Sequence, residues 1–243
     1  MSSGLVISVA ANNAAWCDAV CRAHGRPGEF SRSLWLNRAE VPALYPNAVT
    51  LTPGDVARQL EEISRLDVPG RWGVKDSYAA LDLAPQGFSE LFTAQWIVLP
   101  RDVHGSASVS GARWLTIRDE TPLAAWEAAW RGTPGEHRLD PAHALFRPAL
   151  LDDPNTRLFA AYHGEALIAG AIAYQSAGVV SLSNTFLAEG ASEALRREML
   201  AQVTAAFPGL PLVGYEHGDE LATWCTLGFE PLGTLRVWLK KAG

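Results

Sequence analysis

Polar residues interrupt apolar stretches near the C-terminal end of the chain. Ser183, Asn184 and Thr185 lie inside the run V-V-S-L-S-N-T-F-L, which otherwise reads as an interior strand. Glu216 and His217 follow a second apolar run, P-L-V-G-Y. Carboxylate and imidazole groups are common proton acceptors in catalysis, so these side chains are candidates for a site. The alternative is that the polar residues of the strand face solvent or fill a β-bulge, and that Glu216 and His217 are surface residues.

Small residues precede the helical pattern that begins at Glu193. Gly190 and Ala191 leave room for close approach of a ligand, and Ser192 suits the N-cap position of the helix. The flanking Glu189 and Glu193 would repel an anion bound there. The segment therefore predicts either a ligand loop or a plain helix cap.

Residues 179–239 must position these side chains, and they read as strand, helix, strand, helix, strand. Helices that alternate with short apolar runs predict an α/β layer with crossover connections. Ahead of them, the pattern predicts a strand over 113–118, a helix over 121–131 and a hairpin across the turn His163-Gly164-Glu165.

The N-terminal half shows a similar alternation. It predicts a first strand over residues 5–10, a helix over 11–24, and a short helix over 78–84 capped by Ser77. Further strands are expected over 33–38, 48–51, 72–74 and 91–99, and a further helix over 55–66.

The two halves also repeat each other. The Gly-Phe pairs at 87–88 and 228–229 are 228 − 87 = 141 residues apart, and Trp96 and Trp238 are 238 − 96 = 142 apart. A period this long indicates a duplicated domain, since solenoid periods are about 20–50 residues. Two α/β units that share a turn by chance are the alternative.

The Ser- and Gly-rich segment 101–111 is the best linker in the chain. With the repeat, it predicts two domains, 1–108 and 109–243.

Composition excludes several classes of protein. The chain is 48% hydrophobic and 19% charged, which is typical of a globular protein, and its net charge of −6 argues against a nucleic-acid binder. The N-terminal run is too short and lacks the basic flank of a signal peptide, and no run reaches the ~20 apolar residues of a membrane span. Cys17 and Cys21, one helical turn apart, suit buried packing. Three cysteines cannot all pair, which suits a reducing compartment, so we expect a cytoplasmic protein. The loop containing His137, Asp140 and His143 is too loosely clustered to predict a metal site.

The C-terminal half resembles a GNAT-type N-acetyltransferase in the order of its elements over 113–240. It also resembles the family at Leu227-Gly228-Phe229, the turn that ends the last helix before the last strand. The resemblance implies an α/β fold (α+β in some schemes) of two mixed, mostly antiparallel sheets flanked by helices. The N-terminal half would be a degenerate GNAT-like domain and the C-terminal half the acyltransferase domain.

The same resemblance implies acetyl-CoA as acyl donor and a small-molecule or peptide amine as acceptor. By this resemblance, the strand over 179–187 would diverge from the strand over 212–216, and the backbone groups left free would hold the acyl chain. The loop between strand 179–187 and the helix that begins at Glu193 would hold the pyrophosphate. The cofactor-binding residues implied are Ser183, Asn184, Thr185, Gly190, Ala191 and Ser192.

The catalytic residues implied are Glu216 as base, with His217 second, and Asn184 to orient the thioester. Two features depart from the family. The basic residue that the family carries in its phosphate loop is missing here, and Arg196 and Arg197 come one helical turn later. Trp224 occupies the position where many members carry a tyrosine that acts as general acid. An enzyme and a catalytically inactive binding module therefore both remain as hypotheses.

Overall fold

The computed structural model describes residues 2–100, 110–133, 143–188 and 193–240. The described residues divide into two compact units: those within 1–98 and 215–243 belong to unit 1, and those within 99–214 to unit 2. The helices and strands, in chain order, are α1 (Ser2–Ala23), β1 (Glu29–Phe30), β2 (Leu34–Leu36), β3 (Ala48–Thr50), α2 (Val56–Ser64), β4 (Trp72–Asp76), the 3-10 turn η1 (Ala84–Gln86), β5 (Phe88–Leu99), β6 (Arg113–Ile117), α3 (Glu120–Trp130), the 3-10 turn η3 (Pro148–Leu150), β7 (Thr156–His163), β8 (Ala166–Ser176), β9 (Val179–Leu187), α4 (Glu193–Ala206), β10 (Leu212–Glu216), α5 (Gly218–Thr226) and β11 (Glu230–Lys240).

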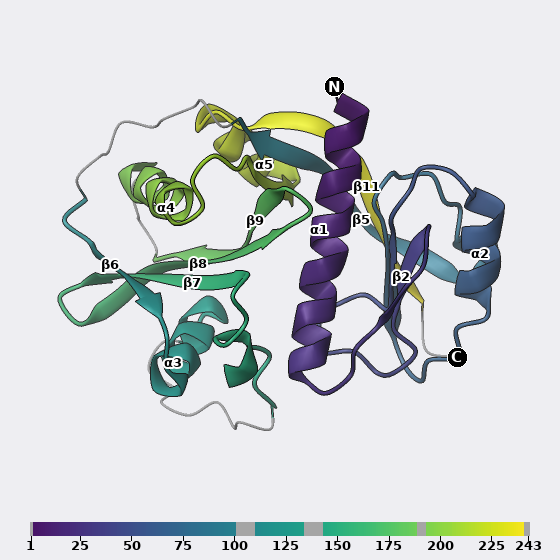
Figure 1. Cartoon of the computed structure of the whole chain (residues 1–243), viewed down its shortest axis with the longest axis horizontal. Coiled ribbons are helices and arrows are strands. Elements are labelled where there is room, and N and C mark those ends of the chain that lie inside the picture. Colours follow the sequence, from purple (N-terminus) through teal and green to yellow (C-terminus); the bar gives the residue numbers. More distant parts are fainter. Residues whose placement is uncertain (1, 101–109, 134–142, 189–192, 241–243) are drawn as a thin grey trace. The chain divides into compact units, whose positions relative to one another are not determined.

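Unit 1 is built around strands in the order β1-β2-β3-β4-β11-β5. Only β3 and β4 are parallel among these neighbours, and α2 connects them. Helices α1 and α2 lie on opposite faces of the strands (Figure 1). The result is a three-layer unit with one core on each face of the sheet.

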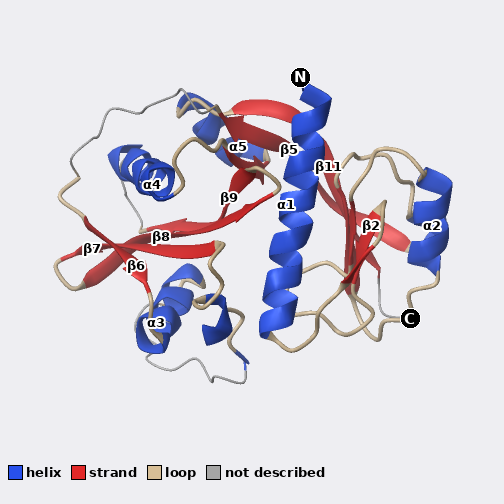
Figure 2. Ribbon diagram, in the orientation of Figure 1, coloured by secondary structure: helices blue, strands red, loops and turns tan. Residues whose placement is uncertain are grey.

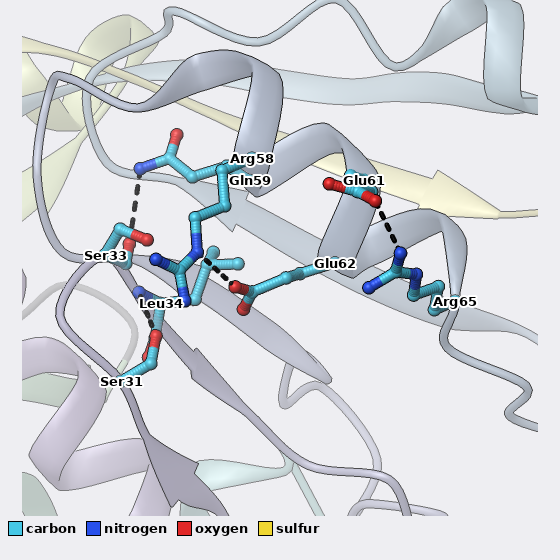
Figure 3. Close-up of polar contacts among 8 residues, drawn as sticks. All are labelled: Ser31, Ser33, Leu34, Arg58, Gln59, Glu61, Glu62 and Arg65. Atoms are coloured by element: carbon cyan, nitrogen blue, oxygen red, sulfur yellow. Dashed lines mark hydrogen bonds and ion pairs between the residues drawn. The ribbon is translucent and has the colours of Figure 1, made fainter.

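The face of the sheet that α2 covers is apolar, and hydrogen bonds of a buried side chain hold the helix against it. Ile63 lies in a buried cluster with Trp72 and Trp238, which come from strands. The Gln59 amide donates to the carbonyl oxygens of Ser33 and Thr52 at 3.2 and 3.0 Å, and the first contact is visible in Figure 3. Because Gln59 is 1% exposed, these bonds satisfy an amide that would otherwise be buried without partners.

The expected strand over residues 5–10 is wrong, because these residues belong to α1. No proline interrupts the segment, and its apolar side chains continue the buried stripe of the helix that was expected from residue 11. Val6 lies 3.8 Å from the position of a Cβ on Gly233, whereas Cys17 and Cys21 pack against Trp35 and Val49. The expectation that Cys17 and Cys21 are buried packing residues is confirmed. Burial on the sheet outweighs the strand preference of the β-branched residues.

Helix α1 is also the one helix in the described part of the chain that is long and apolar enough to cross a membrane. That is weak evidence, because 61% of its apolar window is buried inside the structure and core helices have the same composition.

The expected helix over 78–84 is also wrong. The Asp76 carboxylate accepts hydrogen bonds from the backbone N–H groups of Tyr78 and Leu81, at 3.3 and 2.7 Å. These bonds give the backbone an alternative to a helix. Only the 3-10 turn η1 forms, just before β5.

Unit 2 contains strands in the order β10-β9-β8-β7-β6, of which only β9 and β10 are parallel. Helices α3 and α4 cover opposite faces of these strands (Figure 2). Trp126 anchors α3: its indole N–H donates to the Phe159 carbonyl at 2.9 Å, and its ring meets those of Phe146 and Phe186 edge-on. The predicted fold class, mixed α/β with mostly antiparallel strands flanked by helices, is confirmed.

The compact units differ from the predicted ranges 1–108 and 109–243. Strand β11 lies between β4 and β5, pairing with β4 over Arg236–Lys240, so the last part of the chain packs with the N-terminal strands. The predicted boundary at residue 108 falls outside the described residues, and the two-domain assignment stays a prediction.

The two Gly-Phe pairs have the same local structure. Gly87 and Gly228 adopt φ angles of 81° and 98°. The following Phe88 and Phe229 N–H groups bond to carbonyls five residues back, on Leu83 and Trp224. Gly228-Phe229 is thus the expected end of a helix, in which glycine takes the left-handed position, and Gly87-Phe88 ends the 3-10 turn η1 in the same way.

Candidate functional site

A β-bulge occurs at the polar residues of β9. Ser183 pairs with Ile172 of β8, and the next pair is Phe186 with Gly170. Asn184 and Thr185 therefore stand opposite the single residue Ala171. Asn184 has a φ of 50°, a left-handed conformation that asparagine tolerates better than most residues. Of the two possibilities left open by the sequence, solvent exposure or a bulge, the bulge is present.

The parallel pairing of β9 with β10 ends early. It joins Val180 to Leu212 and Ser181 to Val213, whereas β9 continues to Leu187. Among the described residues, the edge of β9 beyond Ser181 that faces away from β8 has no strand partner. Its backbone donors and acceptors are therefore available to a ligand.

Ser183 adds a side chain to this edge. Its hydroxyl oxygen is buried and has no hydrogen-bond partner in the part of the chain that the structure describes. Buried polar atoms normally have a partner, so an orphaned hydroxyl beside an unpaired strand edge fits a ligand site.

The predicted phosphate loop, with Gly190, Ala191 and Ser192, lies outside the described residues. The helix that follows this loop in the sequence is described: it is α4, which begins at Glu193. Arg197 forms an ion pair with Glu193 at 2.6 Å. The pair partly neutralises the carboxylate that would oppose a phosphate, and it holds Arg197 on the helix surface.

The predicted base, Glu216, is the last residue of β10 and is half-buried. His217 is exposed and precedes α5 as its N-cap residue. Because side chains alternate along an extended backbone, Glu216 points to the opposite face from Tyr215 and His217. Ring contacts support this placement, since Tyr215 and His217 both meet the ring of Phe92.

Trp224 is a core residue. It is 2% exposed, and its ring meets Phe229 edge-on at 5.4 Å. A packed indole at this position cannot donate the proton that a tyrosine would give. The position on α5 at which many GNAT-type members carry a tyrosine therefore supplies no general acid in this protein.

A cluster in unit 1 was missed by sequence reasoning. The Lys75 ammonium donates to the Tyr215 hydroxyl at 3.3 Å and lies 4.4 Å from the centre of that ring. Phe92 stacks on Tyr215, and Trp96 meets it edge-on at 5.5 Å. One signal in the sequence could have found it: W-G-V-K-D places a lysine inside an apolar strand of a chain that has few lysines.

No group of three or more His, Cys, Asp or Glu side chains that could hold a metal occurs within the described ranges. Of the three loop residues considered for a metal, His137 and Asp140 lie outside those ranges.

Comparison with solved structures identifies the fold. A GCN5-related N-acetyltransferase from Kribbella flavida aligns with a TM-score of 0.64 and 15% identity, over 98% of this chain and 96% of that one. The chain has the GNAT fold. No family model and no curated sequence matches it.

Two further GNAT structures align over most of this chain. A protein from Novosphingobium aromaticivorans assigned to the GNAT family gives a TM-score of 0.56 at 15% identity, over 94% of this chain and 96% of that one. A tandem GNAT protein from the clavulanic acid biosynthesis pathway gives 0.50 at 16% identity, over 86% and 78%. At these identities the GNAT neighbours establish architecture, and the chemistry must come from the site.

Proposed function

We propose that the chain transfers an acetyl group from acetyl-CoA to an amine. The observation that carries this proposal is the unpaired edge of β9 at the Asn184 bulge. An acyl-CoA donor has an amide-rich pantetheine arm, and an open strand edge binds such an arm as it would bind another strand. GNAT-fold neighbours that are named acetyltransferases support the same reaction class.

The residues have separate roles. The β9 backbone and the Ser183 hydroxyl bind the donor, Asn184 orients the thioester, and Gly190, Ala191 and Ser192 hold phosphate at the start of α4. Glu216 accepts the proton of the attacking amine, directly or through water. The amine nitrogen bonds to the acetyl carbon, the C–S bond breaks, and the thiolate leaves. Solvent protonates it, because free thiols have a pKa of about 8.5.

A second candidate is a GNAT-shaped binding protein without catalysis. The packed Trp224 favours it, because the α5 position that supplies an acid in many family members is here part of the core. The missing basic residue in the phosphate loop favours it too.

Calorimetric titration with acetyl-CoA separates the two candidates, because the acetyltransferase must bind this donor and the binding protein has lost acyl-CoA binding. Gly190→Glu places a carboxylate in the proposed phosphate loop and should weaken binding about 100-fold or more by charge repulsion and steric obstruction. Gly54→Glu is the matched control: it makes the same change in the corresponding loop of the N-terminal half, where an added Cβ meets nothing within 4 Å.

We expect micromolar binding by the natural chain and by Gly54→Glu, lost in Gly190→Glu. Absence of acetyl-CoA binding by the well-folded natural chain would contradict the acetyltransferase proposal and favour the binding protein. Loss of binding in Gly54→Glu alone would move the donor to the N-terminal half.

Glu216→Gln tests catalysis apart from binding. It removes the base and keeps the shape of the side chain, so kcat for amine acetylation should fall about 100-fold with unchanged acetyl-CoA affinity. An unchanged kcat at all pH values would remove Glu216 from the mechanism. Failure of every amine tested, with donor binding intact, would contradict acetyl transfer to an amine.

A further inference from the structure

Lys75 brings a positive charge into the interior of unit 1. It lies on β4 and is 7% exposed. Its cross-strand neighbours are Val49 on β3 and Val237 on β11, so this row of the sheet is otherwise apolar. Moving an ammonium group out of water costs several kcal/mol unless its charge is compensated. The lysine is therefore poorly explained as a packing residue.

The groups around the ammonium are neutral. Its hydrogen bond goes to the Tyr215 hydroxyl, and no carboxylate lies within ion-pair distance of it in the described part of the chain. Burial raises the pKa of the nearby Cys17 thiol to about 11, so this group is uncharged at neutral pH.

The ammonium itself keeps its charge. Burial lowers the pKa of Lys75, but the hydrogen bond with Tyr215 and the charge interactions with Tyr215 and Cys17, which act at alkaline pH where these groups ionise, outweigh that effect and raise the pKa above its ordinary value of 10.5. The tyrosine ring contributes a cation–π contact as well. These contacts hold the cation without neutralising it.

Aromatic side chains lead from solvent to this cation. His217 is exposed, Phe92 and Tyr215 are half-buried, and Trp96 is 1% exposed. Their rings touch in sequence, with His217 meeting Phe92 at 5.2 Å and Phe92 stacking on Tyr215. The cluster is thus open at the His217 end and ends at a buried charge.

Asn13 supplies an independent sign of a missing partner. It lies one turn before Cys17 on the same face of α1 and is 9% exposed. Its amide oxygen is buried and has no hydrogen-bond partner in the described ranges. A buried amide of this kind is normally satisfied by protein, water or ligand.

We propose that Lys75 and Tyr215 form a binding site in unit 1 for a small aromatic carboxylate. The ammonium and the hydroxyl would both donate to the carboxylate oxygens, and the ring of the ligand would lie against Phe92 and Tyr215. One ammonium and one hydroxyl suit a monoanion with two oxygens, whereas a phosphate carries more charge and more oxygens and usually has further donors, such as arginine forks or several backbone N–H groups. This site is independent of the acetyl-CoA proposal.

The test uses benzoate as probe, with benzamide as its neutral counterpart and inorganic phosphate as a second anion. Binding is measured by calorimetry and by the rise in Tm that a ligand of the native state produces. Lys75→Met removes the charge, and Tyr215→Phe removes only the hydroxyl. Lys240→Met is the matched control, because Lys240 also lies near aromatic rings, those of Trp72 and Phe88, but at the end of β11.

We expect one benzoate per chain, at least tenfold weaker binding in Lys75→Met, a smaller loss in Tyr215→Phe, and no change in Lys240→Met. Benzamide and phosphate should bind at least tenfold more weakly than benzoate. Lys75→Met should fold, since replacing a buried charge by an apolar side chain is often neutral or stabilising.

Several results would overturn the proposal: no benzoate binding by the natural chain, equal binding of benzamide or phosphate, or full binding by Lys75→Met. If Lys75→Met is unfolded, Tyr215→Phe decides, and undiminished benzoate binding in that variant would count against the site.

Discussion

The parallel strand pairs β3–β4 and β9–β10 end differently. In unit 1, β3 pairs with β4 and stops at Thr50, and the protein satisfies the backbone that follows. The Tyr78 hydroxyl donates to the Leu51 carbonyl at 2.8 Å, and the Gln59 amide donates to that of Thr52 at 3.0 Å. In unit 2, β9 continues past its last partner on β10, with a bulge at Asn184.

The difference shows that one crossover arrangement can have two forms. In the closed form, side chains bond to the backbone after the first strand; in the open form, the edge of that strand has no partner. Both pairs consist of a strand, a helix and a parallel strand, and both are followed by a turn or helix that ends in Gly-Phe. Of the two pairs, and within the described residues, the C-terminal one leaves part of a strand edge without a strand partner, and such an edge is what an extended donor needs. The N-terminal pair uses the same groups to stabilise its own turn.

The largest expected effect concerns the closed pair. Asp76→Ala removes the carboxylate that accepts from the N–H groups of Tyr78 and Leu81, and both N–H groups are then left without it. The free energy of unfolding should fall by about 3 kcal/mol, measured by urea denaturation. A loss below ~1 kcal/mol would mean that the turn after β4 is not held by Asp76.

The open pair gives a prediction about strain. Asn184 has φ of 50°, where a β-branched side chain is disfavoured, so Asn184→Val should lower the free energy of unfolding by about 1–2 kcal/mol. Asn184→Gly relieves the conformation and should leave stability equal or slightly higher. Thermal unfolding of the two variants checks this, and equal stability of both would argue that the left-handed bulge is absent in solution.

The crossover helices differ in the charge of their polar anchors. Gln59 of α2 is neutral, whereas Glu198 of α4 accepts hydrogen bonds from Ser110 and from the Trp114 indole. Partial burial raises the pKa of Glu198, but the hydrogen bonds from Ser110 and Trp114 outweigh it and place the pKa below its ordinary value of 4.5.

Because the folded pKa of Glu198 is depressed, its contribution is present above pH 4.5 and is lost as pH falls through the folded pKa. Glu198→Gln should therefore lower the free energy of unfolding by about 0.5–1 kcal/mol at pH 7 and leave it unchanged at low pH. The expected loss is small because solvent screens this partly exposed carboxylate. Gln59→Leu should cost about 1–2 kcal/mol with no such pH dependence. Urea denaturation at several pH values compares them, and a pH-independent loss in Glu198→Gln would contradict the assignment.

Sequence patterns predicted the elements of the C-terminal half well. Strand 179–187, the helix after it and the Gly228-Phe229 close all occur as expected, because strong periodicity and a left-handed glycine are local signals. The first strand was wrong, because residues 5–10 carry β-branched residues yet extend α1. The helix after Ser77 was wrong because Asp76, which is near in sequence, competes for its backbone N–H groups.

The candidate site was only partly visible. Polar residues inside a strand pointed to Ser183 and Asn184, and the bulge explains their presence. The position of β11 between β4 and β5 follows from pairing between segments about 150 residues apart, which no local pattern encodes. The same long-range pairing lets β4 and the end of β10 lie in one unit and bring Lys75 to Tyr215, so that cluster escaped prediction.

Amide hydrogen exchange in the presence and absence of acetyl-CoA tests the central claim most directly. The account predicts that the amides of residues 182–187 exchange faster than those of β3 in the free protein, and that acetyl-CoA slows them while β3 and β4 remain unchanged. Protection that appears at residues 48–52, or acetyl-CoA binding without any change in β9, would contradict the assignment of the donor to the open strand edge.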